Sequence, residues 1–221
     1  MKKLLFAVVL VIGITSLNAQ DKTAKDYKIE GADAYKAKDY AKGLSSFEKS
    51  IQMYEAEGKI DTTLYYNAAI CAIKVKEYQK SVDFFNKSIG YDYKTCKSTL
   101  YKANALDKLE NYEEMETVCT EGVTQCPKYK SKFNEIVFNY YLKSGLEVFN
   151  EAAKMQSVAT PLAQSNPDEY KAEMEKVKAK FNDSLPMLEK AHDLNPKDES
   201  CKNALKQAYE LLDMGAKASA L

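Results

Sequence analysis

The residue types that most often do chemistry are sparse in this chain. His192 is the single histidine among 221 residues, and no two cysteines have the close spacing of a zinc site. His192 falls near the C-terminus of a predicted helix, where an imidazole complements the helix dipole. Because catalysis needs several groups in one constellation, the sequence predicts no enzyme, no metal site and no cofactor.

The N-terminal residues have the pattern of a secretory signal peptide. Two lysines precede an apolar stretch from Leu4 to Ile14 that is too short to span a bilayer. The next residues, Thr15 to Ala19, are mostly small or polar, as in the segment before a cleavage site. We expect removal of residues 1–19, with a cut after Gln20 as the alternative. No cysteine lies at the junction for lipid attachment. We therefore expect a periplasmic or secreted mature chain that has no membrane span.

Export changes the interpretation of the cysteines, which are Cys71, Cys96, Cys119, Cys126 and Cys201. The number is odd, so an oxidising compartment leaves at least one thiol unpaired within the chain. Cys96 begins a predicted helix and Cys126 ends its antiparallel partner, so the topology allows a bridge between them. The alternative is that all five are small buried hydrophobic residues.

The composition is that of a soluble helical protein, with 45% hydrophobic residues, 29% charged residues and a formal net charge of zero. Every basic side chain is a lysine. Arginine suits forked contacts with phosphate and guanine best. Its absence argues against a nucleic-acid partner.

A short pattern recurs along the chain and indicates the elements that carry these residues. In each copy an aromatic residue is followed by small and large residues 3, 7 and 10 positions later. The four copies are Tyr40, Gly43, Phe47 and Ser50; Tyr78, Ser81, Phe85 and Ser88; Tyr112, Met115, Cys119 and Gly122; and Phe181, Ser184, Leu188 and Ala191. In the first three copies a small residue precedes the aromatic by nine positions: Gly31, Ala69 and Ala103. A repeat of 34 to 38 residues is typical of a helical array.

The repeat predicts three antiparallel helix pairs with short polar connectors. Their ranges are Lys25 to Lys36 with Asp39 to Glu57, Thr62 to Lys74 with Glu77 to Ser88, and Cys96 to Leu109 with Tyr112 to Gln125.

With these residues in place, the chain resembles the tetratricopeptide repeat (TPR) family over about residues 24 to 212. The resemblance implies an all-α, right-handed solenoid of helical hairpins with a concave inner face, and a role as a non-enzymatic protein-interaction scaffold. We expect a TPR domain over 20–215, with repeats at about 24–57, 62–95, 96–129 and 130–198, a capping helix at 199–214 and a disordered tail at 216–221.

The fourth unit departs from the period. The 69 residues from Tyr112 to Phe181 could hold two ordinary repeats or one repeat with an elongated hairpin. We favour the elongated hairpin, because a polar stripe keeps helical phase from Lys132 to Lys154. Ser157 to Ser165 is then its loop, and Pro186 kinks its second helix.

The resemblance also implies which side chains face the groove: Lys28, Tyr66, Asn67, Lys74, Lys97, Tyr101 and Lys108. Lys28, Asn67 and Lys97 match three positions of the clamp with which co-chaperone TPR domains hold a C-terminal carboxylate, whereas Ala32 and Tyr101 depart from it. The groove could bind a peptide or protein partner, possibly acidic, in the cell envelope, or it could be a solvated lysine face. A third possibility is a carbohydrate-binding accessory protein, because sixteen tyrosines could stack on sugars; the lack of tryptophan argues against it.

Overall fold

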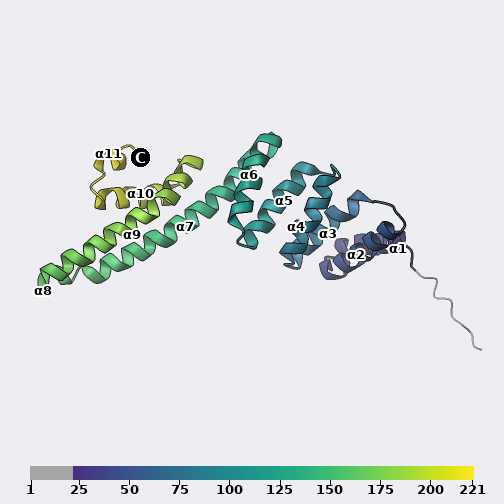
Figure 1. Ribbon diagram of the computed structural model, residues 1–221, viewed down its shortest axis with the longest axis horizontal. Coiled ribbons are helices and arrows are strands. Elements are labelled where there is room, and N and C mark those ends of the chain that lie inside the picture. Colours follow the sequence, from purple (N-terminus) through teal and green to yellow (C-terminus); the bar gives the residue numbers. More distant parts are fainter. Residues whose placement is uncertain (1–21) are drawn as a thin grey trace, which may run out of the picture.

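The computed structural model describes residues 22–221 (Figure 1), so the predicted signal peptide lies outside the described residues. Within that range every regular element is a helix. The elements are α1 (Ala24–Lys36), α2 (Tyr40–Ala56), α3 (Thr62–Lys74), α4 (Tyr78–Gly90), α5 (Thr95–Lys108), α6 (Tyr112–Gln125), the 3-10 turn η1 (Pro127–Tyr129), α7 (Lys130–Ala159), α8 (Leu162–Ser165), α9 (Pro167–Leu194), α10 (Glu199–Leu211) and α11 (Gly215–Ser219). None of these helices is both long and apolar enough to cross a bilayer.

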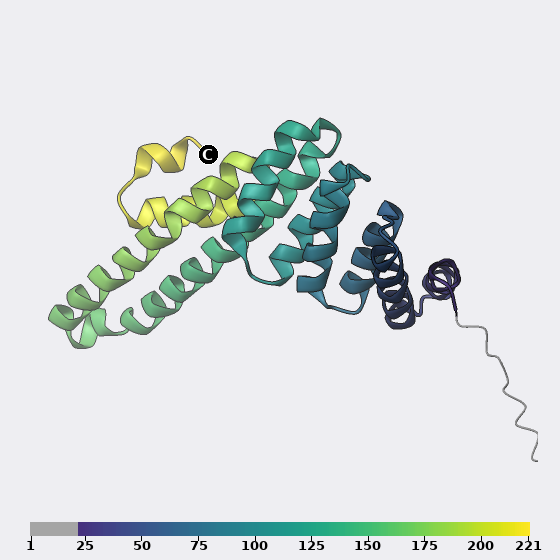
Figure 2. The same cartoon turned by 45° about the vertical axis from the view of Figure 1, so that its right-hand side comes forward.

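Successive helices form antiparallel hairpins that stack side by side into a solenoid (Figures 1 and 2). The three predicted pairs are α1 with α2, α3 with α4, and α5 with α6, and their bounds agree with the sequence pattern to within two residues. Each second helix also packs against the first helix of the next pair. The fold is thus an all-α array of hairpins, as the repeat predicts.

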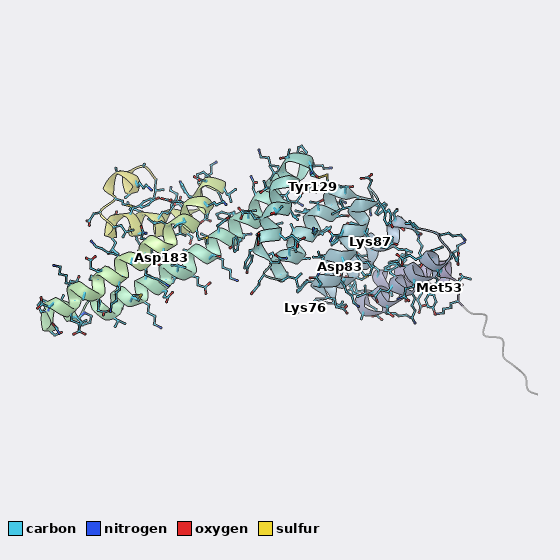
Figure 3. All side chains as sticks on the ribbon, viewed as in Figure 1. Met53, Lys76, Asp83, Lys87, Tyr129 and Asp183 are labelled. Carbon is cyan, nitrogen blue, oxygen red and sulfur yellow. A yellow bond between two sulfur atoms is a disulfide. The ribbon has the colours of Figure 1, made fainter. Side chains whose placement is uncertain are left out.

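The hairpin turns repeat the same backbone geometry. Lys38, Lys76 and Glu110 each lie two residues before the repeat aromatic, and their φ angles are 63°, 66° and 57°. After each of them, the next N–H bonds to a carbonyl five residues back, for example Asp39 N to Ala34 O at 2.9 Å. This arrangement is the Schellman ending of a helix, here with a left-handed residue that is not glycine. Figure 3 marks Lys76 at one of these turns.

The core follows the repeat pattern. The four residues at offset 7 are each at most 1% exposed to solvent; they are Phe47, Phe85, Cys119 and Leu188. Ala69 and Ala103, nine residues before their aromatics, are also fully buried. Large side chains therefore fill the space between hairpins where small residues let the helices approach.

The fourth unit is one elongated hairpin of α7 and α9, which projects beyond the stacked repeats (Figures 1 and 2). Its helices cross closely at Gly145, where a Cβ atom would lie 2.8 Å from Leu188 Cγ. Further out, the rings of Phe149 and Phe181 meet edge to face with centroids 5.1 Å apart. The choice between one long hairpin and two ordinary repeats is therefore settled in favour of the hairpin within the described residues.

One local expectation about this hairpin is wrong. The segment from Ser157 to Ser165 is largely helical, because α7 continues to Ala159 and α8 follows. α9 is a single continuous helix although Pro186 lies within it. Pro186 is exposed, and so is Asn182, whose carbonyl loses its partner. Water can bond to this carbonyl, so the proline is tolerated.

The C-terminal residues are also more ordered than expected. α10 caps the array against α9, as predicted, but residues 216–221 are not a disordered tail, because α11 occupies Gly215–Ser219. Ala218 is buried, and Lys217 Nζ lies 2.7 Å from Glu189 Oε1 of α9. These contacts between distant parts of the sequence stabilise the short helix.

Candidate functional site

A groove of about 530 Å³ lies between α5 and the start of α7. The residues that line it are Lys97, Leu100, Tyr101 and Asn104 of α5, Tyr129 of η1, and Lys132, Glu135, Ile136 and Asn139 of α7. Both walls are first helices of their hairpins, so the groove belongs to the inner face of the array. Figure 3 shows Tyr129 at the junction that leads into α7. Amide, hydroxyl, ammonium and carboxylate groups thus line the groove together with the apolar side chains of Leu100 and Ile136.

A tyrosine cluster continues this face toward the N-terminus. Tyr66 of α3 is buried, and its ring meets Phe85 and Tyr93 edge to face, with centroids 6.0 and 5.9 Å away. Burial raises the pKa of Tyr66 to about 12, and the nearby hydroxyls of four other tyrosines add to the effect; these are Tyr101, Tyr35, Tyr93 and Tyr129. Five tyrosines from three successive repeats therefore share one region of the inner face.

Lysine ammonium groups also lie over the aromatic rings of this region. Lys94 Nζ lies 4.2 Å from the centroid of the Tyr66 ring and 5.1 Å from that of Tyr93. Lys132 Nζ lies 5.9 Å from the Tyr129 ring centroid. Such contacts orient an ammonium group without neutralising its charge. Within residues 22–221, Lys94, Lys97 and Lys132 form no ion pair with a carboxylate, so their charge remains available to an anionic ligand.

The predicted groove residues have different positions in the structure. Lys97 and Tyr101 line the groove, and Tyr101 stacks on Phe85 while it stays 37% exposed. Tyr66 lies in the adjoining cluster. Lys28 lies outside the groove and forms an ion pair with Asp61, the N-cap residue of α3.

The other three predicted residues do not line the groove. Asn67 is partly buried on α3, and Lys74 lies over the Tyr40 ring at 6.0 Å. Lys108 pairs with Asp107 at 2.8 Å.

The sequence prediction missed the α7 wall of the groove. Lys132 begins the polar stripe that the sequence analysis describes, but the resemblance gives inner-face positions only for the three regular repeats. The first turns of α7 occupy the place of a fourth first helix, so the same assignment extended by one repeat would have found them. Tyr129 had no such signal, because it lies in η1 between two helices.

A disulfide closes the open end of the third hairpin. Cys96 Sγ and Cys126 Sγ are 1.97 Å apart and the two Cα atoms are 5.5 Å apart. The other cysteines, Cys71, Cys119 and Cys201, are free and buried. Burial raises the pKa of these thiols to about 11, 12 and 11 respectively, so they carry little thiolate at neutral pH.

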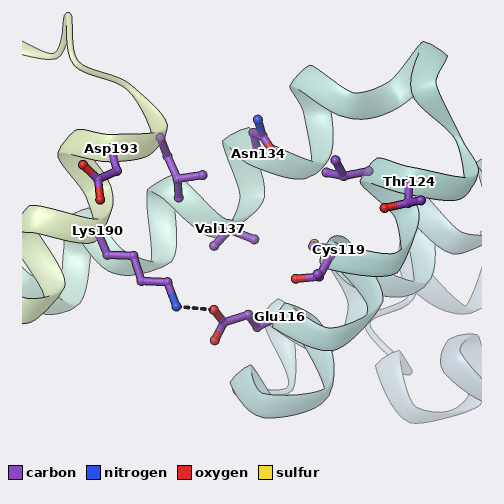
Figure 4. A pocket seen from close by; sticks show the side chains of 10 residues that line it. Glu116, Cys119, Thr124, Asn134, Val137, Lys190 and Asp193 are labelled. Atoms are coloured by element: carbon purple, nitrogen blue, oxygen red, sulfur yellow. Dashed lines mark hydrogen bonds and ion pairs between the residues drawn. The ribbon is translucent and has the colours of Figure 1, made fainter.

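A second cavity of about 420 Å³ lies between α6 and the end of α9 (Figure 4). Cys119, Val123, Val137 and Leu194 contribute apolar surface to it. At one edge, Lys190 Nζ lies 2.5 Å from Glu116 Oε1 and 2.7 Å from the hydroxyl of Tyr141. The hydroxyl of Tyr141 donates to the same Glu116 oxygen at 2.7 Å. This network ties α6, α7 and α9 together.

Among the described residues, no group of three or more His, Cys, Asp or Glu side chains is arranged to hold a metal ion. His192 Nδ1 is buried without a hydrogen-bond partner.

Comparison with known proteins finds distant similarity to two curated proteins. No protein-family model matches the chain. It is 25% identical over 97 residues to the Hsp70/Hsp90 co-chaperone CNS1 of Saccharomyces cerevisiae, a match that covers 44% of this chain and 25% of that protein. It is 28% identical over 102 residues to tetratricopeptide repeat protein 4 of Bos taurus, which covers 45% of this chain and 26% of that protein. The matches thus span about a quarter of each relative.

Two solved structures illustrate the likeness of fold. A TPR repeats protein from Bacteroides fragilis shares 23% identity, covers 85% of this chain and 98% of its own, and has a TM-score of 0.44. YrrB, described as a TPR protein with an unusual peptide-binding site, shares 16% identity, covers 83% and 92%, and has a TM-score of 0.45. The fold assignment rests on the hairpins of this chain and not on these values.

Proposed function

We propose that this protein is a non-enzymatic scaffold of the cell envelope that binds an extended, acidic segment of a partner protein along its inner face. The observation that carries the proposal is the groove between α5 and α7, with Lys97 on one wall and Lys132 on the other. These two ammonium groups form no ion pair within residues 22–221 and line one channel, so they attract carboxylates.

The remaining groups of the groove suit a peptide. The side chain of Asn139 is exposed and forms no hydrogen bond to another described residue, so its amide can bond to a peptide backbone. The half-exposed ring of Tyr101 offers an apolar face at little entropic cost. The relatives named above, a co-chaperone and a TPR protein, are consistent with a role in protein interaction.

The groove also sets the character of the complex. Lysines act as point charges and do not form the paired bonds of arginine, so we expect a modest affinity that falls as salt rises. Glu135 on the α7 wall repels strongly acidic side chains nearby. The best ligand therefore combines one or two carboxylates with apolar residues.

Site-specific photo-crosslinking tests the proposal. A photoreactive phenylalanine at Tyr101 should capture a defined partner from envelope extract, whereas the same group at Asp83, exposed on the second helix α4, should not. Equal capture at both positions would refute a specific groove.

Peptides derived from the captured partner then measure the charge contribution. The change Lys97→Ala with Lys132→Ala should weaken binding at least about tenfold, which is about 1.4 kcal/mol. Lys87→Ala with Lys171→Ala is the matched control, because both lysines are exposed and unpaired within residues 22–221. Binding to a glycan panel without peptide binding would favour a carbohydrate-binding function instead.

A further inference from the structure

The Cys96–Cys126 disulfide lies directly beside the groove. Lys97 follows Cys96 in the chain, and Tyr101 is slightly more than one helical turn further along α5. On the other side, Tyr129 N donates to Cys126 O at 2.8 Å within the turn η1. The bridge therefore joins the start of one groove wall to the turn that leads into the other.

Among the described residues, no polar side-chain contact helps the disulfide to join the two groove walls. Across residues 22–221, no side-chain hydrogen bond or ion pair joins α5 to η1 or α7. The contact between the walls is apolar, as part of the cluster that includes Leu100, Ala103, Phe133 and Val137. Apolar packing is non-directional, whereas a covalent bond fixes the two attachment points. The hairpin turn at Glu110 and Asn111 lies at the opposite end of α5 and cannot hold this end.

We propose that the Cys96–Cys126 disulfide holds the two groove walls in their binding geometry, so that its reduction lowers the affinity of the groove for an acidic peptide. This inference rests on the proposed function for its ligand. It adds that the redox state of one bond regulates the site.

The reductant is a dithiol, and the reaction balances. One thiolate of the dithiol attacks the Sγ of Cys96, the more exposed of the two residues, and Cys126 leaves as a thiolate that takes up a proton. The second thiol of the reductant, as its thiolate, then attacks the mixed disulfide and releases Cys96. The protein gains two electrons and two protons, and the dithiol becomes a disulfide.

The other three cysteines do not take part in this redox response. Cys71, Cys119 and Cys201 are buried thiols that lie in separate parts of the array. Their raised pKa values keep them protonated and slow to exchange. A change in redox conditions therefore acts on the groove without altering the core.

The first measurement counts thiols. Protein purified without reductant and unfolded in denaturant should show three reactive thiols, and five after treatment with dithiothreitol. Five thiols before treatment would overturn the inference, because no bridge would exist to act on the groove.

The second measurement follows the groove itself. Hydrogen exchange of residues 95–102 and 127–136 should accelerate on reduction, while the far-ultraviolet circular dichroism stays the same. The variant Cys96→Ser with Cys126→Ser should behave like the reduced protein, and dithiothreitol should change it no further. Equal exchange in the oxidised and reduced proteins would overturn the inference.

The third measurement is affinity for the acidic peptide obtained by crosslinking at Tyr101. We expect a loss of at least about fivefold on reduction, beyond the range of ordinary surface changes. Equal affinity in both redox states refutes the regulation but leaves the proposed function intact. If no peptide binds in either state, the proposed function fails, and hydrogen exchange alone then decides whether the bridge holds the walls.

Discussion

Lys28 of α1 forms an ion pair with Asp61, the residue that caps α3, so the first helices of two successive repeats are joined. Burial acts to raise the pKa of Asp61, but the hydrogen bonds from Lys28 and Thr63 outweigh it and hold that pKa below its ordinary value. Lys28 therefore contributes to the stack of repeats. Lys97 and Lys132, the two lysines on which the proposed function depends, lie further along the array.

The Lys28–Asp61 pair predicts a pH dependence of stability. Because the folded state lowers the pKa of Asp61, the stabilisation is present above the ordinary aspartate value of about 3.9 and is lost as pH falls through the folded value. Asp61→Asn keeps a good capping residue and removes the charge. We expect a cost of roughly 0.5 to 1 kcal/mol at pH 7, which shrinks toward zero near pH 2.

Urea denaturation at both pH values measures this difference. Asp33→Asn is the control, since Asp33 pairs with Lys36 on the exposed surface of a single helix and links no repeats. A constant difference between the wild type and Asp61→Asn across this pH range would contradict the role of the charge.

Phe85 should be a principal stabilising residue of the array. It is fully buried and contacts the rings of Tyr66 and Tyr101. Phe85→Ala should lower the free energy of unfolding by about 3 to 5 kcal/mol, because it removes a large core side chain and leaves a cavity. Ile60→Ala, at a 55% exposed position, should change it by less than about 0.5 kcal/mol. Thermal or urea unfolding distinguishes the two, and equal effects would refute the assigned repeat register.

Gly122 marks a close approach between α6 and α7. A Cβ atom at this position would lie 2.5 Å from Phe133 Cζ, and Phe133 is itself fully buried. Gly122→Ala should therefore destabilise the protein by about 1 to 3 kcal/mol through overpacking. Gly90, the last residue of α4, has no atom within 4 Å of such a Cβ. Gly90→Ala should be neutral or slightly stabilising in the same unfolding measurement, and a similar loss at both sites would contradict the packing argument.

The network of Tyr141, Glu116 and Lys190 should couple three helices. Tyr141→Phe removes the hydroxyl that contacts both charged groups and should cost about 0.5 to 1.5 kcal/mol. Lys190→Met should cost less in the Tyr141→Phe variant than in the wild type, because the two changes remove shared contacts. A double-mutant cycle by urea denaturation measures the coupling. Strict additivity would show that the network contributes no joint stabilisation.

The hairpins could be predicted because their signal is local and periodic. Tyr40, Tyr78 and Tyr112 each begin a helix two residues after a left-handed turn residue, so the pattern carries both the start of a helix and its preceding turn. The elongated hairpin followed from the helical phase of the polar stripe along α7. These features depend on neighbours within one or two helical turns.

The features that could not be predicted from the sequence depend on contacts between residues distant in the chain. The pairing of Lys28 with Asp61 could not be inferred from inner-face positions, because Asp61 precedes its helix and belongs to no repeat position. The contacts of α11 are also with distant residues, since Ala218 is buried and Lys217 pairs with Glu189. α9 continues past Pro186, and the exposure of this residue to water was not predictable from its local sequence.

The projecting hairpin has a consequence for measurements of size in solution. A helix of 30 residues, such as α7, is about 45 Å long, and much of it extends past the stacked repeats (Figure 1). The frictional drag of such a rod-like extension exceeds that of a sphere of equal mass. A single chain should therefore elute from a sizing column ahead of globular standards of its mass. Light scattering or sedimentation equilibrium, which report mass independently of shape, will distinguish an elongated monomer from a dimer.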